Sequence, residues 1–151
     1  MMVGAPGAGK STFAKKLKKE NQGAVIICGD EIRKYLYGNA DIQGNWVEIH
    51  DEIVRRLEDN AGSVIIMDGT HYRASYRKET LSLLQSYGYS DVEAVVVNPP
   101  LATCLARNAS RSRKVPEYVI EKMHNSLQAS LKGIDGEGFS VVEYVHKQQK
   151  P

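Results

Sequence analysis

The stretch Gly4-Ala-Pro-Gly-Ala-Gly9-Lys10-Ser11 constrains the fold of this chain more than any other. It fits the pattern G-x-x-x-x-G-K-[ST] without a gap, and it lies between a short apolar start, Met1–Val3, and an amphipathic helical pattern. Glycines let the backbone turn tightly and point successive N–H groups inward, which makes an anion-binding nest at the positive end of the following helix. The pattern predicts that this loop binds the phosphates of a nucleoside triphosphate. The predicted binding residues are Gly4, Ala5, Pro6, Gly7, Ala8, Gly9, Lys10, Ser11 and Thr12.

Two side chains of this loop carry the expected chemistry. Lys10 supplies a mobile cation for the β- and γ-phosphates, and Ser11 supplies a hydroxyl for Mg²⁺. The predicted cofactors are therefore ATP and Mg²⁺.

The rest of the chain alternates between two patterns. Short apolar, β-branched runs at 24–28, 63–67, 92–97 and 139–145 are typical of strands in a parallel sheet that is covered on both faces. Between them, apolar residues recur at helical spacing, and Pro100 and Pro116 stand where helices are expected to begin. The alternation predicts a three-layer α/β/α domain with right-handed crossovers. The last residues, Lys147–Pro151, are expected to form a frayed tail.

Size and composition indicate one ordinary globular domain over residues 1–151. Apolar residues make up 42% and charged residues 25% of the 151, which suits a single core. The net charge of +2 provides no strong field for nucleic acid or membrane, and no apolar run is long enough for a membrane helix. We expect a cytoplasmic protein. Cys28 and Cys104 lie far apart, so two buried, reduced thiols are expected rather than a disulfide or a zinc site.

The segment CGDEIRKYLYG places a carboxylate just beyond the second strand. Groups at the carboxyl ends of parallel strands face the ligand crevice, and Arg33 follows Asp30 by one helical turn. Asp30 is suited to accept the proton of an incoming hydroxyl. A helix N-cap is an equally good explanation of an aspartate in this sequence context.

The third strand ends in IIMDGTHYR. Asp68 stands where nucleotide-binding proteins often keep a carboxylate that organises Mg²⁺, and a simple turn residue is the alternative. Thr70 and His71 follow it. His71 lacks Cys, Asp or Glu partners at ligand spacing, so a metal site is not expected there.

Two arginines follow the fourth strand in the stretch LATCLARNASRSRKVP. Arg107 and Arg111 are four residues apart and share one side of the expected helix. Guanidinium groups stabilise the charge that spreads over phosphate oxygens during transfer. A solvated basic helix end is the alternative.

Taken together, GAPGAGKST, GDEIR, IIMDGTHYR and LARNASRSRKVP resemble the kinase domain of the phage-type polynucleotide 5′-hydroxyl kinases and their bacterial P-loop relatives, the adenylate-kinase-like group. The resemblance extends from Gly4 to about Met123. It implies a P-loop fold with a five-stranded, mostly parallel sheet and a short lid that carries arginines.

The resemblance also implies roles for individual residues. Lys10 would contact the phosphates during transfer, Asp30 would be the general base, and Arg33 would contact the acceptor's phosphate and the reacting group. Arg107 and Arg111 would be lid arginines on the ATP phosphates, with Arg107 catalytic, and Ser11 and Asp68 would organise the metal. The family commonly has Asn where this chain has His71. The phosphatase domain of the phage enzyme has no counterpart in these residues, so removal of 3′-phosphate is not expected.

Three further residues leave alternatives open. Trp46 shares a helical face with Ile49 and Ile53, which favours a core position over stacking on a base. Arg73 and Arg77 either track a phosphate backbone or face solvent.

These observations predict an ATP-dependent kinase that phosphorylates a hydroxyl, first of all the 5′-hydroxyl end of RNA or DNA. A kinase of a nucleoside, sugar or other metabolite is the second interpretation. A nucleotide-dependent regulatory ATPase is the third, although no segment that orders around a γ-phosphate is recognisable.

Overall fold

The computed structural model describes residues 1–146, which form two compact units. Unit 1 contains Met1–Lys10 and the described chain from Thr70 onward, and unit 2 contains Ser11–Gly69. The segment expected to be a frayed tail, Lys147–Pro151, lies outside the described residues. A single domain over residues 1–151 stays a prediction. None of the helices in residues 1–146 combines the length and the apolarity that crossing a membrane requires.

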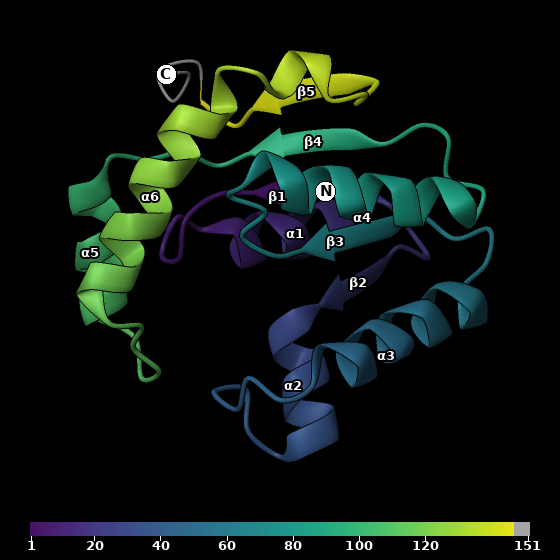
Figure 1. Ribbon diagram of the computed structural model, residues 1–151, viewed down its shortest axis with the longest axis horizontal. Helices are drawn as coiled ribbons and strands as arrows, with labels where there is room; N and C mark the ends of the chain where they lie inside the picture. The colour runs from purple at the N-terminus through teal and green to yellow at the C-terminus, as the bar shows by residue number, and fades with distance from the viewer. Residues whose placement is uncertain (147–151) are drawn as a thin grey trace. The chain divides into compact units, whose positions relative to one another are not determined.

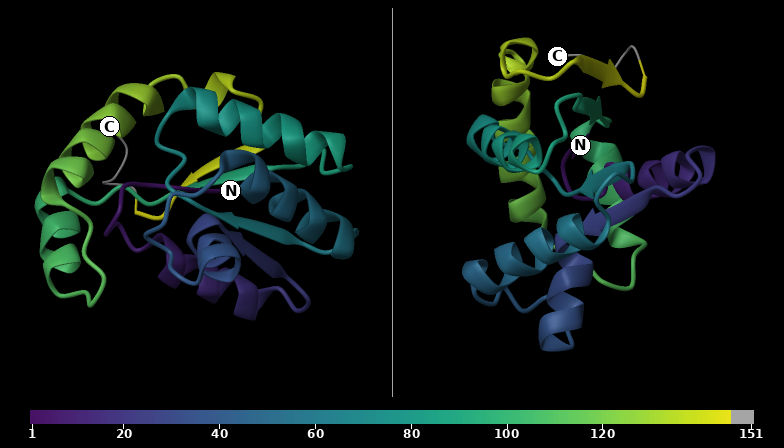
Figure 2. Two further views of the ribbon diagram at one scale, coloured as in Figure 1. Left: turned by 60° about the horizontal axis from the view of Figure 1, so that its bottom comes forward. Right: turned by 90° about the vertical axis from the view of Figure 1, so that its right-hand side faces the viewer.

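Unit 1 is built on a parallel sheet in the order β1-β4-β5 (Figure 1). Its strands are β1 (Met2–Val3), β4 (Glu93–Val96) and β5 (Val141–Tyr144), and its helices are α4 (Ala74–Ser86), α5 (Leu101–Ala109), α6 (Glu117–Leu131) and the 3₁₀ turn η1 (Ile134–Gly136). Helices α5 and α6 lie side by side, as both figures of the fold show (Figures 1 and 2). Val3, Ala94 and Val96 of the sheet are completely buried, as are Ile120 and Leu127 of α6.

Unit 2 contains a second parallel pair, β2 (Val25–Cys28) and β3 (Ile65–Asp68), in register from Val25↔Ile65 to Cys28↔Asp68. Helices α2 (Gly29–Tyr37) and α3 (Trp46–Asp59) form the crossover between the two strands and pack against each other (Figure 2). Helix α1 (Lys10–Glu20) lies in this unit from Ser11 onward.

The strands and helices begin and end for local reasons that the sequence shows. Pro100 and Pro116 are the N-caps of α5 and α6, as expected, because proline has no N–H to leave without a partner at a helix start. Asn45 caps α3 with its side chain, which accepts the N–H of Val47 at 2.9 Å. Gly38 ends α2 in the left-handed conformation, φ 75°, with its N–H bonded to the Lys34 carbonyl.

The α/β class and the parallel pairing are confirmed, but the five-stranded sheet is wrong: the ladders form one sheet of three strands and one of two. The cause lies in β1, which has only two residues. The carbonyl oxygens of Met1 and Val3 accept hydrogen bonds from the N–H groups of Val95 and Val97. The carbonyl of Met2, between them, therefore points to the opposite edge of β1. There His71 Nδ1 contacts the Met2 carbonyl at 2.7 Å, and Gly4 N–H donates to the Thr70 carbonyl at 2.9 Å. These contacts satisfy that edge of β1 without a strand ladder. The three-layer arrangement stays a prediction.

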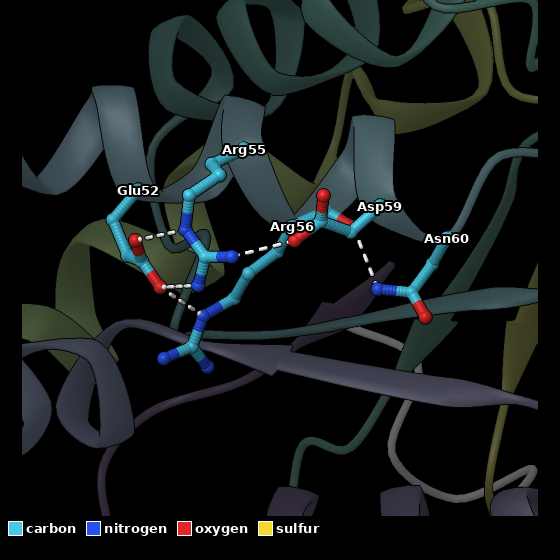
Figure 3. Close-up of polar contacts among 5 residues, drawn as sticks. All are labelled: Glu52, Arg55, Arg56, Asp59 and Asn60. Atoms are coloured by element: carbon cyan, nitrogen blue, oxygen red, sulfur yellow. Dashed lines mark hydrogen bonds and ion pairs between the residues drawn. The ribbon is translucent and has the colours of Figure 1, made fainter.

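Helix α3 carries a network of charges around a buried glutamate (Figure 3). Glu52 is 7% exposed, and its carboxylate accepts hydrogen bonds from Arg55 at 2.7 and 2.8 Å and from Arg56 at 2.7 Å. Arg55 also pairs with Asp59. The Arg56 guanidinium lies over the ring of Tyr35, at 5.6 Å from its centroid, and so joins α3 to α2. The pKa of Glu52 is lowered to about 2, mainly because its carboxylate accepts hydrogen bonds from Arg55.

We expect Glu52→Gln to destabilise the protein by roughly 1–3 kcal/mol at neutral pH, because it removes the negative partner of two arginines. Since the pKa of Glu52 is lower in the folded state than its ordinary value of 4.5, the stabilisation is fully present above that pH and is lost as pH falls toward 2. Urea unfolding at a series of pH values measures it. The wild type and Glu52→Gln should therefore converge in acid, whereas Glu58→Gln, on the same helix, should follow the wild type throughout. A difference that does not change with pH would contradict the assignment.

Candidate functional site

The loop of residues 4–9 connects β1 to α1 and packs directly on main-chain oxygens of unit 1. A Cβ added to Gly4 would collide with the Val97 carbonyl, and one added to Gly7 would collide with the Cys104 carbonyl. Gly7 and Gly9 also have positive φ angles of 79° and 105°, which side chains rarely allow. The glycines are therefore required for this loop to turn where β4 ends and α5 begins.

Lys10 folds back over the loop that precedes it. Its Nζ donates to the Ala5 carbonyl at 2.8 Å, and the residue is only 9% exposed. The ammonium is thus held beside the curled main chain, where an anion bound by the loop would meet it. Burial raises the pKa of the nearby Cys104 thiol, while the charges of Lys10 and Arg107 oppose that shift.

A second cation reaches the same loop from α5. Arg107, in the last turn of the helix, donates from Nη1 to the Ala8 carbonyl at 2.7 Å. Arg111 does not share a helix face with it, because α5 ends at Ala109 and Arg111 lies exposed in the connection to α6. The prediction that the two arginines share one side of a helix is therefore wrong, although both belong to one short segment.

Asn108 holds that segment in place, and sequence reasoning did not single it out. It is 3% exposed, its side-chain amide donates to the Val115 carbonyl at 2.8 Å, and its side-chain oxygen accepts the Val115 N–H at 2.9 Å. The two bonds close residues 109–114 into a loop. The sequence did contain a signal for this role, because Asn108 is a polar residue on the buried side of an amphipathic helix.

In unit 2, the hydroxyl of Ser11 meets the carboxylate of Asp68. Ser11 Oγ donates to Asp68 Oδ2 at 2.8 Å, and Asp68 is 8% exposed at the end of β3. The pair brings together a hydroxyl oxygen and a carboxylate oxygen, and Mg²⁺ prefers oxygen ligands. Within residues 1–146 no cluster of three or more His, Cys, Asp or Glu side chains is placed to hold a metal ion.

Asp30 lies at the same end of the strand pair. The register sets Cys28 opposite Asp68, and Asp30 follows Cys28 by two residues in the first turn of α2. The N-cap of α2 is Cys28, without a side-chain cap, so the capping interpretation of Asp30 is wrong. Cys28 is half-buried, and burial, together with the charges of Asp68 and Asp30, raises the pKa of its thiol.

Arg33 lies beside Asp30 with an unused donor. Its Nη1 is 3.4 Å from Asp30 Oδ1, and its Nε is buried without a hydrogen-bond partner among residues 1–146. A buried N–H without a partner costs free energy, so a water or ligand oxygen at this position would stabilise it. Thr12 is exposed on α1, next to Ser11.

Beyond β3 the chain adopts an uncommon conformation. His71 has a φ of 44°, the one positive φ of a non-glycine residue in the described chain. Arg77 Nη1 donates to the His71 carbonyl at 2.9 Å and holds this turn against α4.

Arg77 neither tracks a phosphate backbone nor faces solvent, so both interpretations were wrong. It is completely buried, and its guanidinium forms two hydrogen bonds with Glu137, at 2.6 and 2.7 Å. It also donates to Ser130. The spacing of Arg77 with the buried Leu81 and Leu84 on α4 was the signal that pointed inward. Trp46 is the opposite case: it is 62% exposed, with its ring centroid 6.2 Å from that of His50, so the favoured core position was wrong.

The fold and the loop define a P-loop protein of the α/β class. Residues 1–132 match the AAA domain family AAA_33, and the chain belongs to this family of P-loop kinases, which confirms the resemblance inferred from its motifs.

Several known proteins of similar sequence or structure are named as kinases. The chain is 29% identical over 136 residues to an L-seryl-tRNA(Sec) kinase of Methanococcus maripaludis, covering 82% of this chain and 50% of that protein. It is 32% identical over 110 residues to a probable adenylyl-sulfate kinase of Pyrococcus abyssi, covering 66% and 63%. A chain of the Pnkp1/Rnl/Hen1 RNA repair complex superimposes with a TM-score of 0.71 at 20% identity, covering 87% of this chain and 44% of that one. The chain thus spans between half and two thirds of the length of the two curated relatives.

Because Arg77 is buried, removing its charge should leave Glu137 without compensation. We expect Arg77→Ala to lower the free energy of unfolding by about 3–5 kcal/mol. Lys78→Ala, at an exposed position of the same helix, should change it by less than about 0.5 kcal/mol. Urea denaturation compares the two. Replacing both partners, Arg77→Met with Glu137→Met, should recover much of the loss. If Arg77→Ala proved no more damaging than Lys78→Ala, the buried pair would not be an important contact.

Proposed function

We propose that this protein is an ATP- and Mg²⁺-dependent kinase that transfers the γ-phosphoryl group to a hydroxyl, most of all the 5′-hydroxyl end of RNA or DNA. The observation that carries the proposal is the pair of cations on one loop: Lys10 on the Ala5 carbonyl and Arg107 on the Ala8 carbonyl. Both side chains carry N–H donors that phosphate oxygens accept.

In the proposed reaction, the loop N–H groups bind the β-phosphate, while Lys10 and Arg107 bind oxygens of the transferred group and stabilise the charge that develops on them. Asp30 accepts the proton of the acceptor hydroxyl as its oxygen bonds to the γ-phosphorus. The bond from the γ-phosphorus to the bridging oxygen breaks, and ADP leaves. Arg33 donates its buried Nε–H to the acceptor or the transferred group.

Ser11 and Asp68 are the residues that would hold the metal. A bound Mg²⁺ would neutralise charge on the β- and γ-phosphates. The hydroxyl of Ser11 already lies at hydrogen-bond distance from Asp68, so Asp68 fixes the orientation of the oxygen that would become a ligand.

Asp30→Asn tests the chemistry. We expect kcat for phosphoryl transfer to fall by about 10²–10⁴-fold, because the amide cannot accept the proton, while ATP binding is retained. Glu31→Gln removes the neighbouring carboxylate of the same helix turn and should keep nearly full activity. Single-turnover transfer from γ-labelled ATP, with ATP affinity measured separately, gives both quantities. Transfer by Asp30→Asn at the parental rate would exclude it as the general base.

The acceptor is tested with a panel of 5′-hydroxyl oligonucleotides, nucleosides and sugars, offered with γ-labelled ATP. An oligonucleotide acceptor should become a poorer substrate as salt rises, because each phosphate contact releases counterions. The similarity to a probable adenylyl-sulfate kinase and the net charge of only +2 favour a second candidate, a small-molecule kinase. Transfer to a free metabolite with a flat salt response would select it. Hydrolysis of ATP without transfer to any acceptor would contradict the kinase proposal.

A further inference from the structure

An exposed arginine lies beside two aromatic rings at the start of α4. The guanidinium carbon of Arg73 is 5.3 Å from the ring centroid of Tyr72 and 5.5 Å from that of Tyr76. The two rings meet edge to face, with centroids 5.6 Å apart and planes at 80°. Tyr72 is buried, and Tyr76 is 41% exposed. We call these three residues the Arg73 cluster.

Within residues 1–146 the Arg73 side chain contacts these two rings and makes no hydrogen bond or ion pair. Arg77 and Arg107, in the same unit, donate to carboxylate or carbonyl oxygens instead. A guanidinium that packs against aromatic rings keeps its N–H donors, which lie along its edge, for hydrogen bonds. The Arg73 cluster therefore presents a pre-oriented cation whose hydrogen-bonding capacity is available to a ligand.

Helix stability does not account for an arginine at this position. Arg73 is the N-cap residue of α4, its side chain caps nothing, and the first turn contains no acidic residue. A cation at the amino end of a helix opposes the helix dipole. The positive charge of Arg73 and that of the helix end add together, which suits an anionic ligand.

The chain limits how far the Arg73 cluster can be from the phosphate loop. Gly4 N–H, at the start of the loop, donates to the Thr70 carbonyl at 2.9 Å. Arg73 follows Thr70 by three residues, so their Cα atoms are at most about 11 Å apart even if that segment were fully extended. A ligand on Arg73 would therefore lie near the phosphate-binding loop of the same unit.

We propose that Arg73 binds a backbone phosphate of a single-stranded nucleic acid acceptor and that Tyr76 contacts an adjoining base. The proposal deepens the proposed function and rests on it, because the strand is the one whose 5′-hydroxyl is phosphorylated. Proteins that bind single strands combine basic side chains with exposed aromatic rings: the cation binds a phosphate, and a base stacks on the ring. A nucleoside or sugar acceptor has no phosphodiester to offer this arginine.

Arg73→Gln tests the contact in the full chain. The probes are a short fluorescent 5′-hydroxyl RNA and its DNA counterpart, whose binding is followed by anisotropy over a range of salt. We expect Arg73→Gln to weaken binding about three- to tenfold and to reduce the slope of log affinity against log salt by about 0.7. In the transfer assay, the effect should fall on KM for the oligonucleotide more than on kcat or on KM for ATP. The RNA and DNA arms distinguish the two kinds of strand.

Lys78→Gln is the matched control, since it removes one exposed positive charge from the same helix. It should leave the affinity and the salt slope close to those of the wild type. Tyr76→Phe should keep the ring and the affinity, whereas Tyr76→Leu should lose part of the affinity because it removes the aromatic face.

The outcomes separate this inference from the proposed function. If the wild type phosphorylates the oligonucleotide and Arg73→Gln behaves like Lys78→Gln, the Arg73 contact is wrong and the kinase proposal stands. If the oligonucleotide binds in an Arg73-dependent way but is never phosphorylated, the kinase proposal fails and the binding site stands. If the wild type phosphorylates only metabolites and binds no oligonucleotide, the inference is overturned.

Discussion

The phosphate loop depends on how closely its backbone approaches the carbonyl groups of its own unit. A single added carbon at Gly4 or Gly7 would collide with the Val97 or Cys104 carbonyl. The end of β4 and the second turn of α5 therefore determine the shape of the loop, and the sheet β1-β4-β5 determines where they lie. Lys10 and Arg107 then bind carbonyls of the loop itself. A loop fixed in this way offers its N–H groups to an anion with little loss of conformational entropy on binding.

The sequence predicted the features that arise from neighbouring residues. The strands lie within two residues of their expected bounds, and α5 and α6 begin directly after their prolines, because apolar runs and helix starts are set locally. Arg77 was missed because its partner Glu137 is sixty residues away. Helical spacing shows which residues share a face of one helix. It does not show which charged residue of another helix or loop will pack against that face.

The same limit explains the errors at Trp46 and β1. Trp46 has the helical spacing of the buried Ile49 and Ile53, yet it is the first residue of α3, and at a helix end one face no longer has a neighbour to pack against. β1 was recognised as very short, but nothing local shows that the His71 side chain contacts the Met2 carbonyl. That contact joins two residues far apart in sequence, which is the kind of interaction that a local pattern does not predict.

The first turn of α2 explains why we propose a chemical role for Asp30 and not for its neighbour. Asp30 and Glu31 both place negative charge near the amino end of the helix, so either one satisfies the helix dipole. Helix stability therefore requires only one of them, and it does not require a carboxylate next to an arginine. Yet Asp30 is the one that lies beside Arg33, whose buried Nε has no partner in the described chain. A second carboxylate that the helix does not need, next to a donor that the fold leaves unsatisfied, is the arrangement expected where an acceptor hydroxyl and its phosphate are to be bound together.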